Sequence, residues 1–238
     1  MFAMFYIFGL ACNIFADLAD ATAQGNHVSA NDYPDRYWIG LNNPNISGQL
    51  DGTFTITTPP DTDIWRPNVT ADNFTAPFVY TVCRTANFRS INVTVTAEWK
   101  TQYDQGGLAI VFPSANNSAL GAKWIKSGLE VPDTDGIPAM GTVATYAFSD
   151  WSLSPIVPVN ATSARFEAER STTELWIYRL GEGGERQQLR EVTWAFLEER
   201  GEPEAEMWVG VYAAKPTEEA DNPDQGLTVT FSDLQVDC

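Results

Sequence analysis

The chain has 238 residues, of which 44% are hydrophobic and 19% charged, enough apolar sequence to fill one large β-domain core. Its 14 Lys and Arg residues are outnumbered by 31 Asp and Glu residues, which gives a formal net charge of −17. A field of this sign repels phosphate backbones, and no basic stripe offsets it. We therefore expect no nucleic-acid partner.

The N-terminal segment is apolar. Residues 1–16, MFAMFYIFGLACNIFA, contain one polar residue, Asn13, and are too short to span a bilayer, so we expect no membrane partner. They match the apolar region of a secretory signal, with Ala21-Thr22-Ala23 as a small-residue cleavage site. Residues 1–23 are therefore a possible signal peptide. The alternative is a loose N-terminal segment, because no Lys or Arg precedes Arg36.

Asn-x-Ser/Thr triplets and cysteines bear on the compartment. The sequence contains six Asn-x-Ser/Thr triplets, and the one at Asn92 lies inside a predicted strand. In a secreted protein, glycan attachment is predicted at the other five, Asn45, Asn68, Asn73, Asn116 and Asn160. We expect secretion, with a cytoplasmic location as the alternative. Removal of the segment that contains Cys12 would leave Cys83 and Cys238, whose pairing the spacing alone leaves open.

Period-two alternation predicts the secondary structure from residue 53 onward. In residues 91–100, INVTVTAEWK, apolar and polar side chains alternate, as in a half-buried antiparallel strand. Residues 194–200 are the one stretch that could form a helical turn or two. Apolar or alternating runs separated by Gly/Pro turns predict strands at 53–57, 91–100, 108–112, 123–131, 141–148, 164–170, 174–180, 189–196, 207–213 and 227–236.

About ten short strands without a βαβ rhythm predict an all-β jelly-roll sandwich of two antiparallel sheets. We place this single domain at residues 36–238. The predicted core residues are Ile91, Val93, Val95, Leu108, Ile110, Val209 and Val211.

Few residues in the sequence support catalysis or metal binding. His27 is the sole histidine, which excludes a Ser-His-Asp triad and a multi-histidine metal site. Asp133-Thr-Asp135-Gly136 resembles the start of a calcium loop, but Ala144 stands where the closing Glu should be, so a turn is expected. The alternating acid strand of laminarinase-like enzymes is not found. We expect no metal and no cofactor.

Two stretches carry polar residues beside predicted core strands. Tyr103-Asp-Gln-Gly-Gly107 precedes the apolar run 108–112, where Asp104 and Gln105 are expected to hydrogen-bond a turn and the glycines to allow unusual dihedrals and close backbone approach. In the strand KWIKSGLE (123–130), alternation places Trp124, Lys126 and Glu130 on one face. That face fits either a sugar site or a solvated Lys126–Glu130 pair with Trp124 in the packing.

Longer segments carry a resemblance to a known family. They are DTDIWRP (61–67), FRSINVTVTAEWKTQYDQGGLAIVFP (88–113), KWIKSGLE (123–130), FSDWSLSP (148–155), LREVTWAFLE (189–198) and AEMWVGVYAAKP (205–216). The chain resembles, over about residues 36 to 237, a fungal and bacterial family of uncharacterised concanavalin A-like proteins that includes the fungal regulation-of-enolase protein. The resemblance implies a lectin/glucanase fold and no defined reaction.

From these observations we expect a non-catalytic domain that binds a carbohydrate, or a protein partner connected with carbohydrate metabolism. The alternative is a glycan-cleaving enzyme whose acid pair comes from Glu98, Asp104, Glu130 or Asp150. The family's recurring motifs predict that a ligand site lies where the 103–107 turn, the 123–130 strand and the SDWS turn converge. Its predicted residues are Tyr103, Asp104, Gln105, Trp124, Lys126, Glu130, Asp150 and Trp151.

Overall fold

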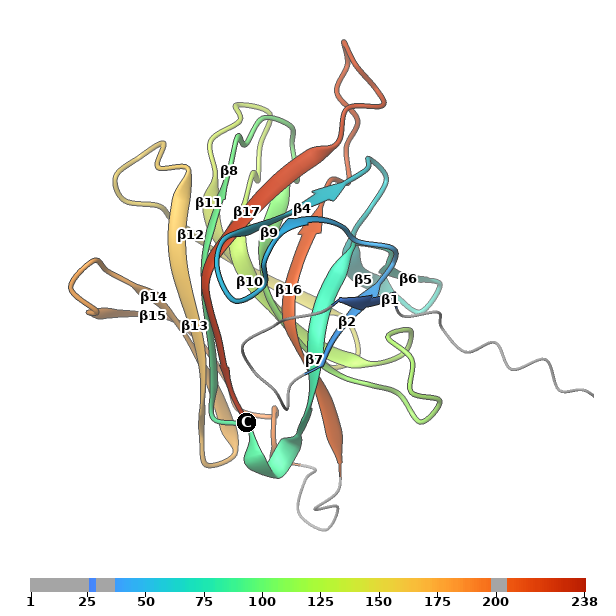
Figure 1. The fold of residues 1–238 in the computed structure, drawn as a ribbon, viewed down its shortest axis with the longest axis vertical. Coiled ribbons are helices and arrows are strands. Elements are labelled where there is room, and N and C mark those ends of the chain that lie inside the picture. Colours follow the sequence, from blue (N-terminus) through green and yellow to red (C-terminus); the bar gives the residue numbers. More distant parts are fainter. Residues whose placement is uncertain (1–25, 29–36, 198–204) are drawn as a thin grey trace, which may run out of the picture.

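The computed structural model describes residues 26–28, 37–197 and 205–238, and these residues form an all-β sandwich (Figure 1). In the described residues, two antiparallel sheets of eight and seven strands pack face to face, and a two-stranded hairpin lies outside them. The predicted fold class is confirmed. Within the described ranges, a helix with the length and hydropathy of a membrane span does not occur.

The strands alternate with turns along the whole described chain, and one 3₁₀ turn, η1 (Thr85–Asn87), lies between β7 and β8. The strands are β1 (Asn26–Val28), β2 (Trp38–Leu41), β3 (Asn45–Gly48), β4 (Phe54–Thr58), β5 (Ile64–Asn68), β6 (Ala71–Phe74), β7 (Phe78–Arg84), β8 (Ser90–Ala97), β9 (Gln105–Phe112), β10 (Lys123–Glu130), β11 (Ala139–Thr145), β12 (Ser149–Pro155), β13 (Ser163–Ser171), β14 (Glu174–Leu180), β15 (Arg186–Val192), β16 (Glu206–Ala214) and β17 (Leu227–Asp237).

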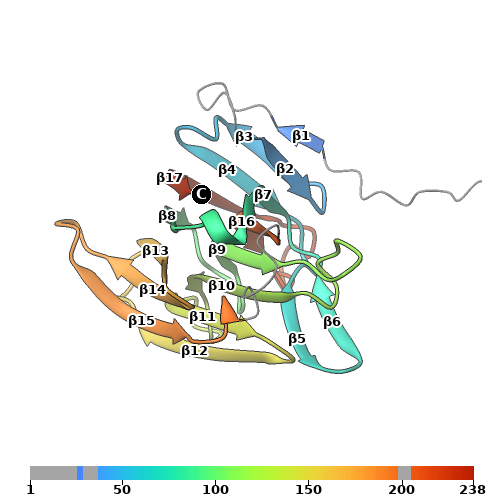
Figure 2. The same cartoon turned by 90° about the horizontal axis from the view of Figure 1, so that it is seen from below.

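The strand order shows how distant segments come together. The first sheet has the order β1-β2-β7-β16-β9-β10-β11-β12, the second has the order β15-β14-β13-β8-β17-β4-β3, and β5 pairs with β6. Seen from below, the β5–β6 hairpin lies on the opposite side of the first sheet from β13 to β15 (Figure 2). The hairpin therefore covers the outer face of the first sheet, away from the second sheet.

The main core lies between the two sheets, as the alternation predicts. The predicted core residues are confirmed, because each has a relative exposure of 0%: Ile91, Val93, Val95, Leu108, Ile110, Val209 and Val211. A second apolar cluster, which includes Phe74, Trp124 and Tyr212, fills the space between the first sheet and the hairpin. Strands β9, β10 and β16 are consequently buried on both faces, which explains the continuous apolar run at 108–112.

Three expectations from the sequence differ from the structure. The SDWS segment is not a turn: it begins strand β12, which pairs with β11 along its length. The sequence does not predict strands β1, β2, β3, β5, β6 and β7, because they are short or lack clean alternation, and β1 lies before the predicted start of the domain at residue 36. Residues 193–196 form turns rather than a helix, Leu197 has a 3₁₀ conformation, and residues 198–200 lie outside the described residues.

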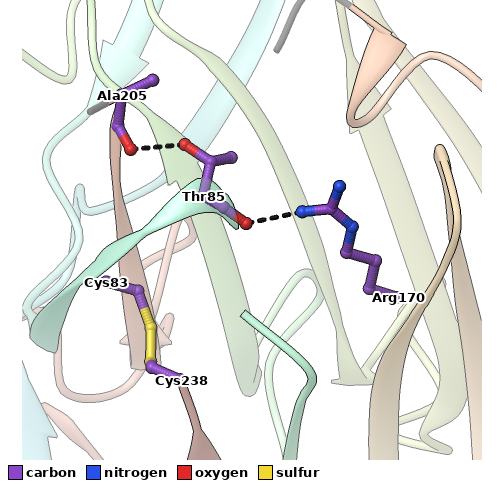
Figure 3. The surroundings of a disulfide bond; sticks show 5 residues. All are labelled: Cys83, Thr85, Arg170, Ala205 and Cys238. Carbon is purple, nitrogen blue, oxygen red and sulfur yellow. Dashed lines mark hydrogen bonds between the residues drawn. A yellow bond between two sulfur atoms is a disulfide. The ribbon is translucent and has the colours of Figure 1, made fainter. Parts of the chain in front are cut away.

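Cys83 and Cys238 form a disulfide with a Cα–Cα distance of 5.8 Å (Figure 3). Cys83 lies in β7 of the first sheet, and Cys238 directly follows β17 of the second. Beside it, the Thr85 hydroxyl donates to the Ala205 carbonyl at 2.6 Å, and Arg170 Nη1 donates to the Thr85 carbonyl at 2.6 Å. The bond therefore joins the two sheets at the C-terminus of the chain. It answers the question that the spacing left open.

The predicted glycan acceptors lie at the surface. Asn45, Asn68, Asn73, Asn116 and Asn160 are all exposed. The side chain of Asn92, in contrast, is half-buried and hydrogen-bonds Arg165 and Gln235. Modification of the exposed asparagines stays a prediction.

Candidate functional site

A pocket of about 220 Å³ opens on the outer face of the first sheet, beside the β5–β6 hairpin. Five of the eight residues predicted as ligand-binding line it, and two further residues come from the hairpin segment. The lining residues are Asp63, Trp65, Tyr103, Gln105, Lys126, Glu130 and Trp151. The structure thus brings the 103–107 segment, the KWIKSGLE strand and the SDWS strand to one place.

The polar floor comes from β9 and β10. Glu130 pairs with Gln105 across the two strands, and Lys126 stands four residues before Glu130 on the same face. Gly128 lies between Lys126 and Glu130 on β10, and the register pairs it with Gly107 of β9. A Cβ on either glycine would lie 2.0–2.1 Å from a carbonyl oxygen of the other strand, so neither position accepts a side chain. The Lys126 side chain therefore extends across a bare stretch of sheet to reach Gln105.

The Lys126 ammonium is buried, with 2% exposure, and is held by groups from other elements. Its Nζ donates to Gln105 Oε1 at 2.5 Å and lies 3.9 Å from Asp63 Oδ1. Gln105 Nε2 in turn donates to Asp63 Oδ1 and to the Tyr103 carbonyl, both at 3.3 Å. Nζ also lies 5.6 Å from the ring centroid of Tyr212. An ammonium carries three donors, so Lys126 retains hydrogen-bonding capacity toward the pocket.

Glu130 is the most buried carboxyl in the pocket, with 8% exposure. Burial raises the pKa of this carboxyl above its ordinary value, Lys126 and Trp151 act to lower the pKa, and Asp63 acts to raise it further. The pKa of Tyr212 is raised well above its usual value by burial and then by Glu130 and Asp63. Glu130 and Asp63 thus both oppose a further negative charge at Tyr212, and Lys126 is the positive group beside them.

Gly141 of β11 leaves room for the Glu130 carboxyl. A Cβ at Gly141 would lie 2.8 Å from Glu130 Oε2 and 3.3 Å from Trp151 Nε1, so both groups converge on this gap. Trp151 Nε1 is buried and directs its N–H to the neighbouring Glu130 carboxyl, whose pKa it lowers as a donor, but the two groups do not reach the geometry of a full hydrogen bond. A buried donor without an acceptor is costly unless a ligand or water supplies one.

Aromatic side chains form the walls. Trp65 and Trp151 are half-buried and meet edge to face, with ring centroids 6.3 Å apart. Tyr103 is 37% exposed and stands at the open side, where its backbone has a φ of 69°. This left-handed residue is Tyr103 and not a glycine, which corrects the expectation that Gly106 and Gly107 supply the unusual dihedrals.

The hairpin is fixed to the sheet by Arg66. Its Nε lies 2.8 Å from Asp72 Oδ1 on β6, within the hairpin, and its Nη2 donates at 2.8 Å to the carbonyl of Ala122, which directly precedes β10 of the sheet. Its backbone N–H donates to the Ser149 hydroxyl at 2.8 Å. Asp63 and Trp65 lie on the same segment, so these contacts set the position of one wall of the pocket.

Asp104 lies outside the pocket. Its Oδ2 accepts hydrogen bonds from the backbone N–H groups of Thr101, at 2.8 Å, and Lys100, at 3.2 Å, which confirms the expected turn role. Its Oδ1 lies 3.1 Å from Lys215 Nζ, and both side chains are 1% exposed. Both oxygens of this carboxylate therefore have partners in the turn and the buried ion pair, and Asp104 does not line the pocket.

Trp124 and Asp150 are also absent from the pocket lining. Trp124 is 1% exposed and packs edge to face against Phe74 of the hairpin, so its ring cannot stack on a ligand in the pocket. Asp150 points to the other face of β12 and is exposed, with its Oδ2 2.6 Å from Arg190 Nη2. Of the four carboxyls considered for an acid pair, Glu130 alone lines the pocket.

Sequence reasoning missed Asp63 and Trp65. Both lie in DTDIWRP, one of the segments that carry the family resemblance, but the segment shows no strand alternation and no chemical motif. Their role depends on the hairpin folding over the sheet, which local sequence does not encode.

Described residues with metal-ligand side chains are scattered: no group of three such side chains gathers among them. Asp133 and Asp135 of the calcium-like segment accept hydrogen bonds from nearby backbone N–H groups, as in a turn.

Comparison with known proteins identifies the family. Residues 38–238 match the family described as "Protein of unknown function (DUF1349)". The chain belongs to this family. An uncharacterized protein from Emericella nidulans is 38% identical over 189 residues, which cover 79% of this chain and 88% of the relative.

Solved structures agree on the fold. A functionally unknown protein from Saccharomyces cerevisiae matches with a TM-score of 0.63 and 23% identity over 84% of this chain and 95% of its own. The GH43 BlXynB protein from Bacillus licheniformis matches with a TM-score of 0.52 and 13% identity over 75% of this chain and 31% of its own. An alginate lyase from Klebsiella pneumoniae matches with a TM-score of 0.50 and 11% identity over 80% and 83%. At these identities the likeness shows the fold alone.

Proposed function

We propose that this DUF1349 protein binds a carbohydrate in the pocket beside the β5–β6 hairpin and does not cleave it. The observation that carries the proposal is the combination of aromatic walls, Trp65 and Trp151, with a buried polar floor of Gln105, Lys126 and Glu130. Flat rings match the C–H face of a sugar, and the floor offers both donors and acceptors to its hydroxyls.

The unpaired donors support the same conclusion. The Trp151 N–H lies beside the Glu130 carboxyl without completing a hydrogen bond to it, and Lys126 has donors beyond the one used by Gln105. A sugar hydroxyl accepts from such donors and donates to Glu130 or Asp63 at the same time. A protein partner connected with carbohydrate metabolism, the other expectation, would need an extended surface, whereas this site is a pocket.

A glycan array followed by calorimetric titration of the hits tests the proposal. Trp151→Ala is expected to weaken binding of a hit by about tenfold or more, which corresponds to at least 1.4 kcal/mol. Trp176→Ala is the matched control, because Trp176 is also half-buried but stacks on Tyr178 in the second sheet. Failure of every glycan to bind, or equal losses in the two variants, contradicts the proposal.

One observation favours a second candidate, a glycan-cleaving enzyme. Asp63 and Glu130 line the same pocket, and a carboxyl with a raised pKa is the form that a general acid takes. Reducing-sugar release measured on each array hit separates the two. Release that Glu130→Gln abolishes would establish cleavage, and binding without release supports the non-catalytic function.

We propose further that the protein is secreted and carries N-glycans. The disulfide between Cys83 and Cys238 supports this, because such bonds persist in oxidising compartments. The exposed asparagines of the Asn-x-Ser/Thr triplets are consistent with it. Expression in a fungal host followed by endoglycosidase treatment tests it, and an unshifted gel band together with an intact Met1 would place the protein in the cytoplasm.

A further inference from the structure

We infer that the pocket prefers a sugar that carries a protonated amine, such as glucosamine, over neutral or acidic sugars. The inference rests on the proposed carbohydrate binding and assigns its ligand class. It follows from the balance of charge among the residues that line the pocket and from the aromatic rings that line it with them.

The pocket holds more negative than positive groups. Its seven lining residues include two carboxyls, Asp63 and Glu130, and one ammonium, Lys126. The ammonium is directed to Gln105 Oε1 and Asp63 Oδ1. Arg66, the nearest cation on the hairpin, is committed to Asp72 and the Ala122 carbonyl. Glu130 is therefore the carboxyl whose charge is least compensated.

Glu130 lines the pocket, so a ligand group in the pocket can approach its carboxyl. Glu130 Oε2 lies over Gly141, where a Cβ would come within 2.8 Å of it, and Trp151 Nε1 is the neighbour on that side. An ammonium group bound at this point would gain the Coulomb attraction of a buried carboxylate, which exceeds the attraction at an exposed one because water screens it less. A uronate carboxylate at the same point would meet two like charges.

The walls suit the same ligand. Aromatic faces attract cations through the ring quadrupole, and Trp does so most strongly. Trp65, Trp151 and Tyr103 place three rings around the two carboxyls. The protein's net charge of −17 adds a long-range attraction for a cationic oligosaccharide.

Calorimetric titration with matched oligosaccharides tests the inference at a pH at which the sugar amine is protonated. The ligands are tetramers of glucosamine, N-acetylglucosamine and glucose, which have similar rings and differ at one substituent. Glucosamine tetramer is expected to bind about tenfold or more tightly than the other two. Glu130→Gln is expected to abolish this preference.

The control variant is Glu182→Gln. Glu182 is exposed in the turn between β14 and β15, so this substitution removes the same charge from the protein without touching the pocket. It is expected to keep the preference, which separates a local site from the attraction of the whole molecule. Equal loss in both variants would overturn the inference, as would binding of glucose tetramer as tight as that of glucosamine tetramer. In these two cases carbohydrate binding itself stands. Absence of binding to all three tetramers and to every other glycan would overturn both proposals.

Discussion

Burial opposes ionisation of Glu130, whereas a ligand that supplies a positive charge favours it. The groups that face this carboxyl are Lys126 on its own strand, Gln105 on β9, Tyr212 on β16, Trp151 on β12 and Asp63 before β5. Because the raised pKa is due mainly to burial, the uncomplexed protein holds the proton on Glu130 to a higher pH than the unfolded chain does.

A pH-dependent stability difference follows. The stability that protonated Glu130 contributes is fully present below the unfolded pKa, near 4.5, and is lost as the pH rises through the higher folded pKa. Glu130→Gln removes this loss. Relative to the native protein, the variant is therefore expected to gain in melting temperature as the pH is raised from about 4 to neutrality. Thermal melts across that range check this, and a difference that stays constant with pH would contradict it.

The buried pair of Asp104 and Lys215 gives a second prediction at this scale. Lys215→Ala strands a carboxylate that is 1% exposed, so it is expected to lower the free energy of unfolding by about 3–5 kcal/mol. The double variant with Asp104→Asn should lose less than the sum of the single losses, because the pair acts as a unit. Urea unfolding of the four proteins measures this. Additive losses would show that the two side chains are independent.

Residue-level prediction from sequence worked where the cause was local. The turn role of Asp104 followed from its position before an apolar strand, and alternation placed Lys126 and Glu130 on one face. It could not show that this face is covered. Alternation therefore allows a solvated Lys126–Glu130 pair, whereas Lys126 is buried in the structure. The burial of Trp124 under Phe74 has the same origin.

At the scale of elements, the β5–β6 hairpin decides what the outer face of the first sheet can do. It covers Trp124 and Tyr212, and it places Asp63 and Trp65 against residues from β9, β10 and β12. Sequence patterns found the long strands of both sheets because these strands either alternate, as β8 does, or form a continuous apolar run, as β9 does. The sequence does not predict the hairpin strands, because Arg66-Pro67 interrupts any alternation and the pairing of the two strands shifts register between Trp65 and Asn68.

Loosening this hairpin is expected to weaken ligand binding without removing a lining residue. Arg66→Ala breaks the contacts with Asp72 and the Ala122 carbonyl and leaves every residue of the pocket in place. The dissociation constant of an array hit is expected to rise by about tenfold. Calorimetric titration of the folded variant measures it, and an unchanged constant would mean that the hairpin does not position the pocket.

For the whole molecule, the disulfide between Cys83 and the C-terminal Cys238 links the two sheets of the sandwich. Strand β17 lies in the second sheet between β8 and β4, and the disulfide then joins it to β7 of the first sheet. Cys83 and Cys238 are 155 residues apart in the sequence, and only the fold shows that their Cα atoms come close enough for a disulfide to join the two side chains.

Removing this disulfide is expected to destabilise the protein as a whole. A Cys83→Ser and Cys238→Ser double variant should lose about 2–5 kcal/mol of unfolding free energy, since the bond closes a long loop in the unfolded chain. Urea unfolding of the variant, and of the native protein with and without reductant, measures the loss. If the urea midpoint of the native protein is the same with and without reductant, the prediction is contradicted.

The most direct test of carbohydrate binding in the pocket is an NMR titration that follows the indole N–H signals of the eight tryptophans with a glycan identified on the array. Assignment uses single Trp→Phe variants. The signals of Trp65 and Trp151 are expected to shift on binding, and Trp151 most, because its N–H gains an acceptor. Those of Trp124, under the hairpin, and Trp176, on the second sheet, should stay in place. Saturating glycan that leaves the Trp65 and Trp151 signals unmoved would contradict binding at this pocket.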